Sequence, residues 1–176
     1  LYLNNNQLSG MIPSELGLLN QLQYLYLNNN QLSGMIPSEL GLCIFIEYMD
    51  FSYNSVSGMI PLELQHLRNL DLLYLRGNYL SGGVPAELGH LKVLQYLDIG
   101  DNQLTGELPY ELVNLESLKT FVASANRFSG DLNNLFNYSK VISMLTTVDV
   151  SNNGFTGSLP NALFASTSLR TFVGAQ

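Results

Sequence analysis

Hydrophobic and polar positions recur along this chain with a period of 24 residues. Residues 1–18 read LYLNNNQLSGMIPSELGL, and residues 25–42 repeat the same letters. In each unit two apolar positions alternate with other residues, as at Leu25 and Leu27, which is typical of a short strand with one buried face. Further along, Leu16, Leu19 and Leu22 are spaced by three, which predicts a 3-10-like or helical turn. One unit cannot bury this many leucines alone, so the pattern predicts a solenoid of stacked repeats.

Asparagine, glycine and proline also occupy fixed columns of the repeat. The asparagine ends each predicted strand, and its side chain can bond to backbone groups of its own and adjacent turns. We therefore expect a structural asparagine ladder made of Asn6, Asn30, Asn54, Asn78, Asn102, Asn126 and Asn153. The glycine column permits a bend that other residues resist. After it, Gly-x-Ile-Pro predicts a second short extended segment, because proline forces the preceding residue to be extended.

The repeat accounts for the whole chain as a single array. We expect repeats at 1–24, 25–48, 49–72, 73–96, 97–120, 121–147 and 148–171, with a partial repeat at 172–176. The sixth repeat is longer and has Asn133 in the proline column, so its extra residues are expected to bulge on the convex or lateral side. The chain opens in mid-motif and stops within a strand, without terminal caps. We expect a fragment of a longer protein; a short array without caps is the alternative.

The full unit reads L-x-L-x-x-N-x-L-S/T-G-x-I/L-P-x-x-L-G-x-L. This pattern resembles the plant-type 24-residue class of leucine-rich repeat proteins, over residues 1–176. That class occurs in the ectodomains of receptor-like kinases and receptor-like proteins, and in polygalacturonase-inhibiting proteins. The resemblance implies an α/β solenoid: a right-handed superhelix with a concave parallel β-sheet and short 3-10 or helical turns on the convex side. It also implies an extracellular or cell-surface location, although the chain shows no signal peptide.

Composition and charge exclude several classes of protein. Leucine occurs 35 times and asparagine 19 times, while charged residues make up only 12%. The net charge of −7 argues against binding to nucleic acid phosphates and to anionic membrane surfaces. No apolar run approaches the length of a membrane span. A single cysteine allows no intramolecular disulfide.

The chain carries no recognisable catalytic, nucleotide-binding or metal-binding motif, so we expect no enzyme, no cofactor and no metal site. Cys43 replaces a leucine of the core and is expected to be a small buried hydrophobe. His66 and His90 are expected to be solvated rather than a metal pair. The glutamate column could suggest calcium, but each acid follows proline in the first turn of a short helix, where the helix dipole favours it. Asn137, in the only Asn-x-Ser/Thr sequence, is a candidate glycosylation site.

Ligand recognition is expected on the concave face, from strand positions that point away from the core. Four columns should project there, and the fourth runs Asn4, Asn28, Ser52, Arg76, Gly100, Ser124 and Ser151. Six of the ten tyrosines fall on these columns, all within the first four repeats, with acids beside them. The candidate binding residues are Tyr2, Tyr24, Tyr26, Glu47, Tyr48, Asp50, Asp71, Tyr74, Arg76, Tyr96 and Asp98. Tyrosine provides rigid amphipathic area, which favours recognition, but it also suits exposed strands in general.

These features favour a non-catalytic module that recognises a protein, peptide or glycan, as in the extracellular region of a receptor-like protein or kinase. A kinase domain would then lie elsewhere in the parent chain. One alternative is a secreted protein similar to polygalacturonase inhibitors. The other is a structural or ice-binding array, which the curved sheet and the variable fourth column disfavour.

Overall fold

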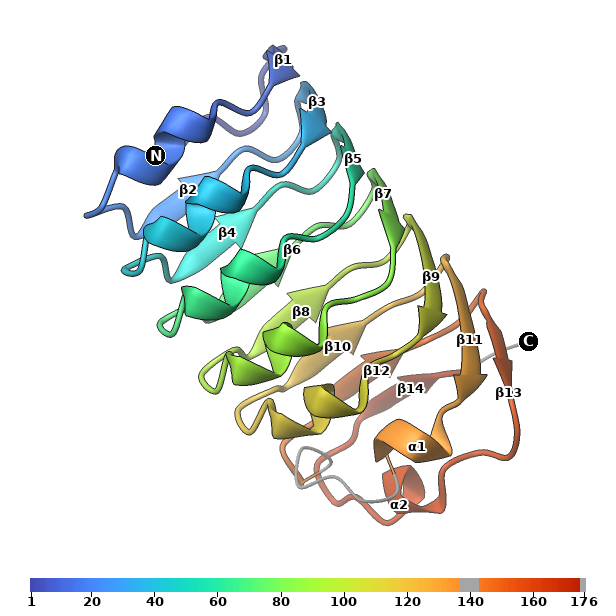
Figure 1. Cartoon of the computed structure of the whole chain (residues 1–176). Helices are drawn as coiled ribbons and strands as arrows, with labels where there is room; N and C mark the ends of the chain where they lie inside the picture. The colour runs from blue at the N-terminus through green and yellow to red at the C-terminus, as the bar shows by residue number, and fades with distance from the viewer. Residues whose placement is uncertain (137–142, 175–176) are drawn as a thin grey trace.

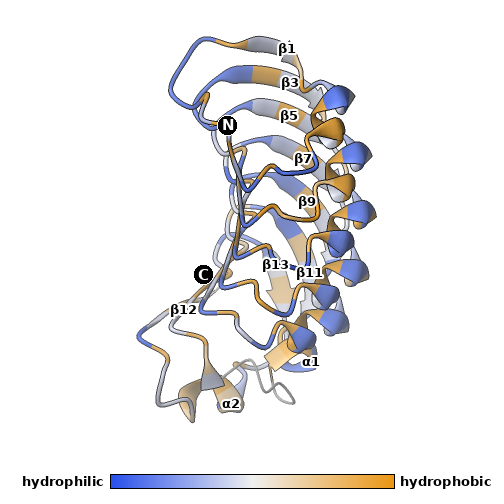
Figure 2. Cartoon of the chain, turned by 90° about the vertical axis from the view of Figure 1, so that its left-hand side faces the viewer, coloured by the Kyte–Doolittle hydropathy of each residue, from blue (hydrophilic) through white to orange (hydrophobic). Residues whose placement is uncertain are grey.

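The chain forms a curved stack of similar turns (Figure 1). The computed structural model describes residues 1–136 and 143–174. Each regular turn contributes one strand to each of two parallel sheets and one short helix. Figure 2 shows the short helices along the outer rim of the curve. The predicted solenoid, with a parallel sheet on one side and short helical turns on the other, is confirmed.

The inner sheet lines the concave side. It has seven parallel strands: β2 (Tyr24–Tyr26), β4 (Tyr48–Asp50), β6 (Leu72–Tyr74), β8 (Tyr96–Asp98), β10 (Thr120–Val122), β12 (Thr147–Asp149) and β14 (Thr171–Val173). Equivalent residues pair in register, so that Leu25 lies beside Met49 and Met49 beside Leu73. The central residue of each strand from β2 to β12 is buried, while its two neighbours are only half-buried. This alternation is what the period-two pattern predicts.

A second parallel sheet, which the sequence pattern did not predict as such, runs along the adjoining side of the solenoid. Its strands are β1 (Ser9–Met11), β3 (Gln31–Met35), β5 (Ser55–Gly58), β7 (Tyr79–Gly82), β9 (Gln103–Glu107), β11 (Arg127–Asp131) and β13 (Gly154–Thr156). The extended segment was expected at Gly-x-Ile-Pro, but the strands begin before the glycine. The glycine stays within the ladder of hydrogen bonds at a positive φ, +76° at Gly34, which other residues rarely adopt.

Five 3-10 helices follow the proline column on the convex side. They are η1 (Ser14–Leu18), η2 (Ser38–Leu42), η3 (Leu62–His66), η4 (Ala86–His90) and η5 (Tyr110–Asn114). Each proline precedes its helix with extended backbone, as at Pro13. Two later turns carry short α-helices instead, α1 (Asn133–Phe136) and α2 (Asn161–Phe164). In the repeat without proline, Asp131 Oδ1 accepts a hydrogen bond from Asn133 N, 2.9 Å away.

The leucine columns form one continuous core through the stack. Leu73, Leu97 and Cys43 are fully buried. The Cys43 thiol donates to Leu16 O over 3.3 Å, and burial raises its pKa, so the thiolate that would react is disfavoured. Among residues 1–136 and 143–174, no helix is long and apolar enough to cross a membrane.

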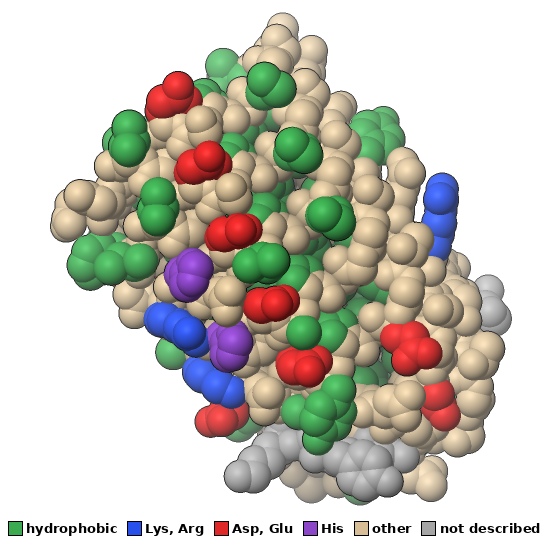
Figure 3. Space-filling view, in the orientation of Figure 1, with side chains coloured by type: hydrophobic (Ala, Val, Ile, Leu, Met, Phe, Trp, Pro, Cys, Tyr) green, Lys and Arg blue, Asp and Glu red, His purple; other side chains and the backbone are tan. Residues whose placement is uncertain are grey.

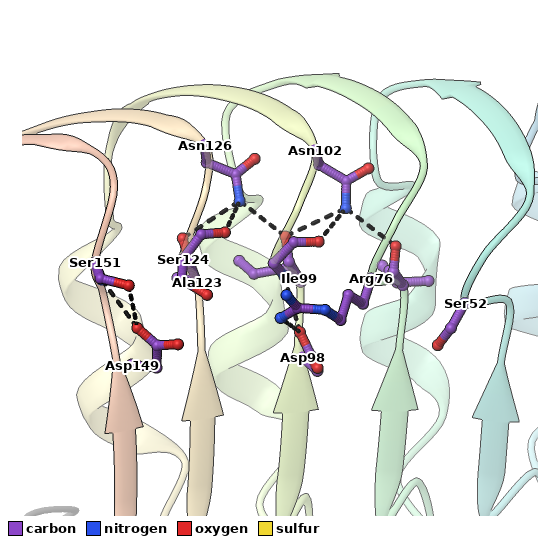
Figure 4. A network of polar contacts seen from close by, with 12 residues as sticks. Ser52, Arg76, Asp98, Ile99, Asn102, Ala123, Ser124, Asn126, Asp149 and Ser151 are labelled. Carbon is purple, nitrogen blue, oxygen red and sulfur yellow. Dashed lines mark hydrogen bonds and ion pairs between the residues drawn. The ribbon is translucent and has the colours of Figure 1, made fainter. Parts of the chain in front are cut away.

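The repeated asparagines join one turn to the next with their side chains. Asn78 Nδ2 donates to Phe51 O of the preceding turn at 2.9 Å and to Leu75 O of its own turn at 3.1 Å. Asn78 Oδ1 accepts from Val56 N of the preceding turn at 2.9 Å. Figure 4 shows the corresponding donations from Asn102 Nδ2 and Asn126 Nδ2. These contacts pair backbone groups that the bend after each inner strand removes from the sheet.

Candidate functional site

The inner sheet brings the sequence-predicted tyrosines of the concave face together on neighbouring strands. Tyr24 and Tyr26 lie on β2, Tyr48 on β4, Tyr74 on β6 and Tyr96 on β8, and all five are half-buried. Their side chains point away from the core because the central residues of the same strands, such as Leu25 and Leu73, fill it. Tyr2 forms an isolated parallel bridge with Tyr26 and is 67% exposed.

Four of these tyrosines stack on one another. The ring centroids are 5.2 Å apart for Tyr2 and Tyr26, 6.3 Å for Tyr2 and Tyr24, and 5.3 Å for Tyr24 and Tyr48. The interplanar angles are 17–18°, so the rings are nearly parallel. Because the ring faces cover each other, this tyrosine stack (Tyr2, Tyr24, Tyr26, Tyr48) presents mainly ring edges and hydroxyl groups to a ligand.

Carboxylates lie beside the tyrosines on β4 to β8. Asp50 Oδ1 accepts hydrogen bonds from Ser52 N at 2.9 Å and from Ser52 Oγ at 2.6 Å. The Asp71 carboxyl forms a side-chain hydrogen bond with Tyr48, while its Oδ1 atom is buried without a hydrogen-bond partner in the described part of the chain. The charge of Asp71 is the main reason why the pKa of the neighbouring Tyr48 hydroxyl is raised.

Asp98 and Arg76 form the ion pair of this surface (Figure 4). The Arg76 Nη1 atom lies 3.9 Å from Asp98 Oδ1, which also accepts a hydrogen bond from Gly100 N at 2.9 Å. Burial raises the pKa of Asp98 above its ordinary value, while the Gly100 hydrogen bond and the Arg76 charge act against the rise. Burial likewise raises the pKa of Tyr74, with a further contribution from Asp98.

Replacing Arg76 with glutamine should raise the pKa of Asp98 further, because the charge that opposes the effect of burial is removed. A group with a folded-state pKa above its unfolded value binds more protons when folded. The contribution of Asp98 to stability therefore falls as the pH rises from its ordinary value through the raised pKa, and the variant should deepen that fall. NMR titration of the carboxyl carbon measures the pKa. The distant Arg127→Gln change is the control, and an unchanged or lowered Asp98 pKa in the Arg76 variant would contradict the assignment.

The fourth predicted column of the concave face is partly wrong. Ser52 is 6% exposed and Ser124 is 3% exposed, and Gly100 is also buried. At Ser52 and Gly100 the backbone N atom donates to Oδ1 of the aspartate two residues earlier, so these residues lie in a tight turn directly after the strand. Arg76 and Asn28 of the same column remain half-buried and reach the surface.

Sequence reasoning missed Asn28 as a candidate binding residue. Its Oδ1 atom, like that of Asp71, is buried without a hydrogen-bond partner among the described residues. A buried acceptor without a donor is costly, so these two atoms are locally unfavourable positions of the concave side. Only neighbouring repeats could indicate this, because the burial of Asn28 depends on the turns stacked beside it.

The remaining candidates are the two histidines, a possible metal site and the glycosylation site. His90 Nδ1 lies 3.0 Å from Gln65 Oε1, and both His66 and His90 are exposed. The described residues contain no group of three or more His, Cys, Asp or Glu side chains placed to hold a metal ion. Asn137, the candidate glycosylation site, lies outside the described residues.

Comparisons with known proteins agree on one family. The Leucine Rich Repeat model matches residues 1–19, 21–43, 45–67, 69–91, 93–115 and 144–165. No match is found among curated proteins. Among solved structures, the chain is similar to the plant peptide hormone receptor RGFR1 in complex with RGF2, with 38% identity and a TM-score of 0.92 over 98% of this chain and 27% of that one.

Two further structures, both from Arabidopsis, show the same likeness. The ectodomain of the receptor kinase HAESA, in complex with an IDA peptide hormone, matches with 29% identity and a TM-score of 0.90, over 95% of this chain and 28% of that one. The ectodomain of GASSHO1/SCHENGEN3, in complex with CASPARIAN STRIP INTEGRITY FACTOR 2, has 34% identity and a TM-score of 0.80, over 93% of this chain and 22% of that one. The chain thus spans about a quarter of the length of these receptor structures.

Proposed function

Because the chain belongs to the leucine-rich repeat family, we propose that it is a non-catalytic recognition module that binds a peptide or protein ligand on its concave face. The binding surface is the N-terminal half of that face, from β2 to β8. It comprises the tyrosine stack with Tyr74 and Tyr96, the acids Glu47, Asp50, Asp71 and Asp98, and Arg76.

The observation that carries this proposal is the tyrosine stack with acidic side chains beside it on the same strands. Tyrosine contributes large contact area at low cost in side-chain entropy, which is why it is common at recognition surfaces. The half-buried Asp71 carboxylate, beside Tyr48, would favour a ligand amide or cationic group. The four acids outnumber the one arginine, so a ligand with net positive charge is favoured.

The geometry of the stack also favours a peptide over a glycan. A sugar ring packs on an open aromatic face, and Tyr2 and Tyr24 each have two stacked neighbours at interplanar angles of 17–18°. Ring edges and hydroxyls suit the amides and side chains of an extended peptide. The similar receptors are solved with peptide hormones bound, which supports a peptide ligand and an extracellular location for this chain as well.

Selection from a displayed random peptide library tests the proposal and needs no known ligand. The chain should enrich peptides with an excess of Lys and Arg, and binding should weaken at higher salt because the charge pairs are partly exposed. A parallel selection against Asp71→Asn, Asp98→Asn protein should lose the cationic bias. Enrichment of neutral or acidic peptides by the unchanged protein would contradict the proposed chemistry of the surface.

A further inference from the structure

The outer side of the solenoid carries a groove that the concave proposal does not use. It lies between the second sheet and the 3-10 helices and crosses the first four repeats, with a volume of about 1070 Å³. Methionines form one side and glutamates the other, with prolines between them. Three repeats supply the two rows, which are Met11, Met35 and Met59, and Glu15, Glu39 and Glu63. Figure 3 shows the row of acidic side chains with hydrophobic side chains beside it.

The three methionines form an exposed apolar row in which each lies over a glycine of the next repeat. A Cβ atom added to Gly34 would lie 2.9 Å from Met11 Cγ, and one added to Gly58 would lie 2.8 Å from Met35 Cγ. The glycine column therefore leaves room for the methionines to lie flat along the sheet. Met11, Met35 and Met59 nevertheless remain 75%, 67% and 68% exposed. Flexible, polarisable side chains in an exposed row are typical of a surface that adapts to an apolar partner.

The glutamates facing this row have no cationic partner in the described part of the chain. The ion pairs found there are Arg76 with Asp98 and Lys92 with Glu116, and both lie elsewhere. Ser14 Oγ lies 3.5 Å from Glu15 Oε2, and Ser38 Oγ lies 3.3 Å from Glu39 Oε2, so the carboxylates keep neutral neighbours. An uncompensated acidic row therefore runs parallel to an apolar row, with one residue of each kind per repeat.

We propose that this groove docks a cationic amphipathic helix of a partner protein. Paired strands are spaced by about 4.8 Å, which sets the distance between successive methionines along the second sheet. One helical turn rises about 5.4 Å, so a helix places one apolar residue per turn almost in step with the row. In an extended chain, side chains on the same face recur every two residues, about 6.6 Å apart. Such a chain would lose register with the methionine row after two repeats. Charge complementarity then assigns Lys and Arg to the flank of the helix that faces the glutamates.

A second copy of this chain is a poorer occupant. It has a net charge of −7, and the helices of its described part are four or five residues long, so they offer no cationic apolar face of this length. An anionic lipid surface would be repelled by the glutamate row. The proposal is independent of the concave ligand, because the two surfaces lie on different sides of the core.

Methyl NMR of the methionines with a designed probe tests this docking. The probe is a peptide of about four helical turns made of Leu and Lys, with Leu at positions i, i+4 and i+7. The methyl signals of Met11, Met35 and Met59 should shift together and saturate. Met49, which is fully buried, and Met144, near the other end of the array, should not move. A permuted peptide of the same composition, without an apolar stripe, is the control and should bind at least about tenfold more weakly.

Two pairs of substitutions separate the apolar and ionic parts of the site. Met35→Ser with Met59→Ser, and Glu39→Gln with Glu63→Gln, should each weaken binding of the Leu-Lys helix by about tenfold or more. These side chains are exposed or half-buried on the surface, and circular dichroism verifies that the variants fold. Met144→Ser, which changes an exposed methionine near the other end of the array, should leave the affinity unchanged. Equal binding of the permuted peptide, shifts at Met49 or Met144, unaffected variants, or burial of the groove in a dimer of the free chain would each overturn the proposal.

Discussion

Replacing Asn78 with alanine is expected to lower the free energy of unfolding by about 2–4 kcal/mol. The change removes the donor to Phe51 O and Leu75 O and the acceptor for Val56 N. Asn78 is only 7% exposed, so water cannot easily replace these bonds. Each unpaired buried group costs about 1–3 kcal/mol, and partial relaxation reduces the sum. Chemical denaturation followed by circular dichroism measures the effect.

Asn6 offers a matched control for this variant. It has the same place in the repeat and bonds to Leu3 O and Asn4 O of its own turn, but it is exposed to solvent. Asn6→Ala should therefore change stability by less than about 1 kcal/mol. Equal effects of the two substitutions would show that the bonds between turns do not stabilise the stack.

The joint replacement of Tyr26, Tyr48 and Tyr74 with alanine should weaken binding of a library-selected peptide by about a hundredfold or more. Anchoring aromatic residues at interfaces each contribute about 2 kcal/mol or more when truncated, although their effects are not strictly additive. The three residues are half-buried and point away from the core, so the melting temperature should change little. Isothermal titration calorimetry measures the affinity, and a thermal melt checks the fold.

Three tyrosines outside the concave columns provide the control for this prediction. Tyr53, Tyr79 and Tyr110 are 51%, 57% and 55% exposed. Their joint replacement by alanine removes the same kind and number of side chains from the surface and should leave the affinity within about twofold. If the control variant binds the peptide as weakly as the concave-face variant, the loss reflects nonspecific contacts of exposed tyrosines and not a binding site.

The repeat pattern predicted most of the architecture because every turn repeats the same order of strand, bend and short helix. The alternation of Leu25 and Leu27 predicted the inner strands, and the spacing of Leu16, Leu19 and Leu22 predicted the helical turns. The sequence did not predict the second sheet, because its strands, such as β3, include a glycine. Gly34 has φ +76°, and a glycine at such a position usually indicates a bend and not a strand. The sequence also did not predict the positive φ values of Tyr53 and Ala125, because these residue types do not usually adopt this conformation.

The candidate site was only partly readable from the sequence, since it depends on how neighbouring turns meet. Column counting placed Tyr24 and Tyr48 on one face, but their stacking is a product of the register between β2 and β4. Ser52, counted as a surface position, is buried and donates its Oγ hydrogen to Asp50 Oδ1. The sequence did not predict the outer groove. Its glutamates are typical acids of a first helical turn, and only the structure places the methionines opposite them.

The most direct test of the central claim is a crystal structure of the chain with a library-selected peptide bound. We expect the peptide to cross β2, β4, β6 and β8, with contacts to Tyr48 and Tyr74 and with a cationic group near the Asp71 carboxylate. A peptide seated instead on the second sheet, on the 3-10 helices or on the C-terminal strands β10 to β14 would contradict recognition through the N-terminal concave face.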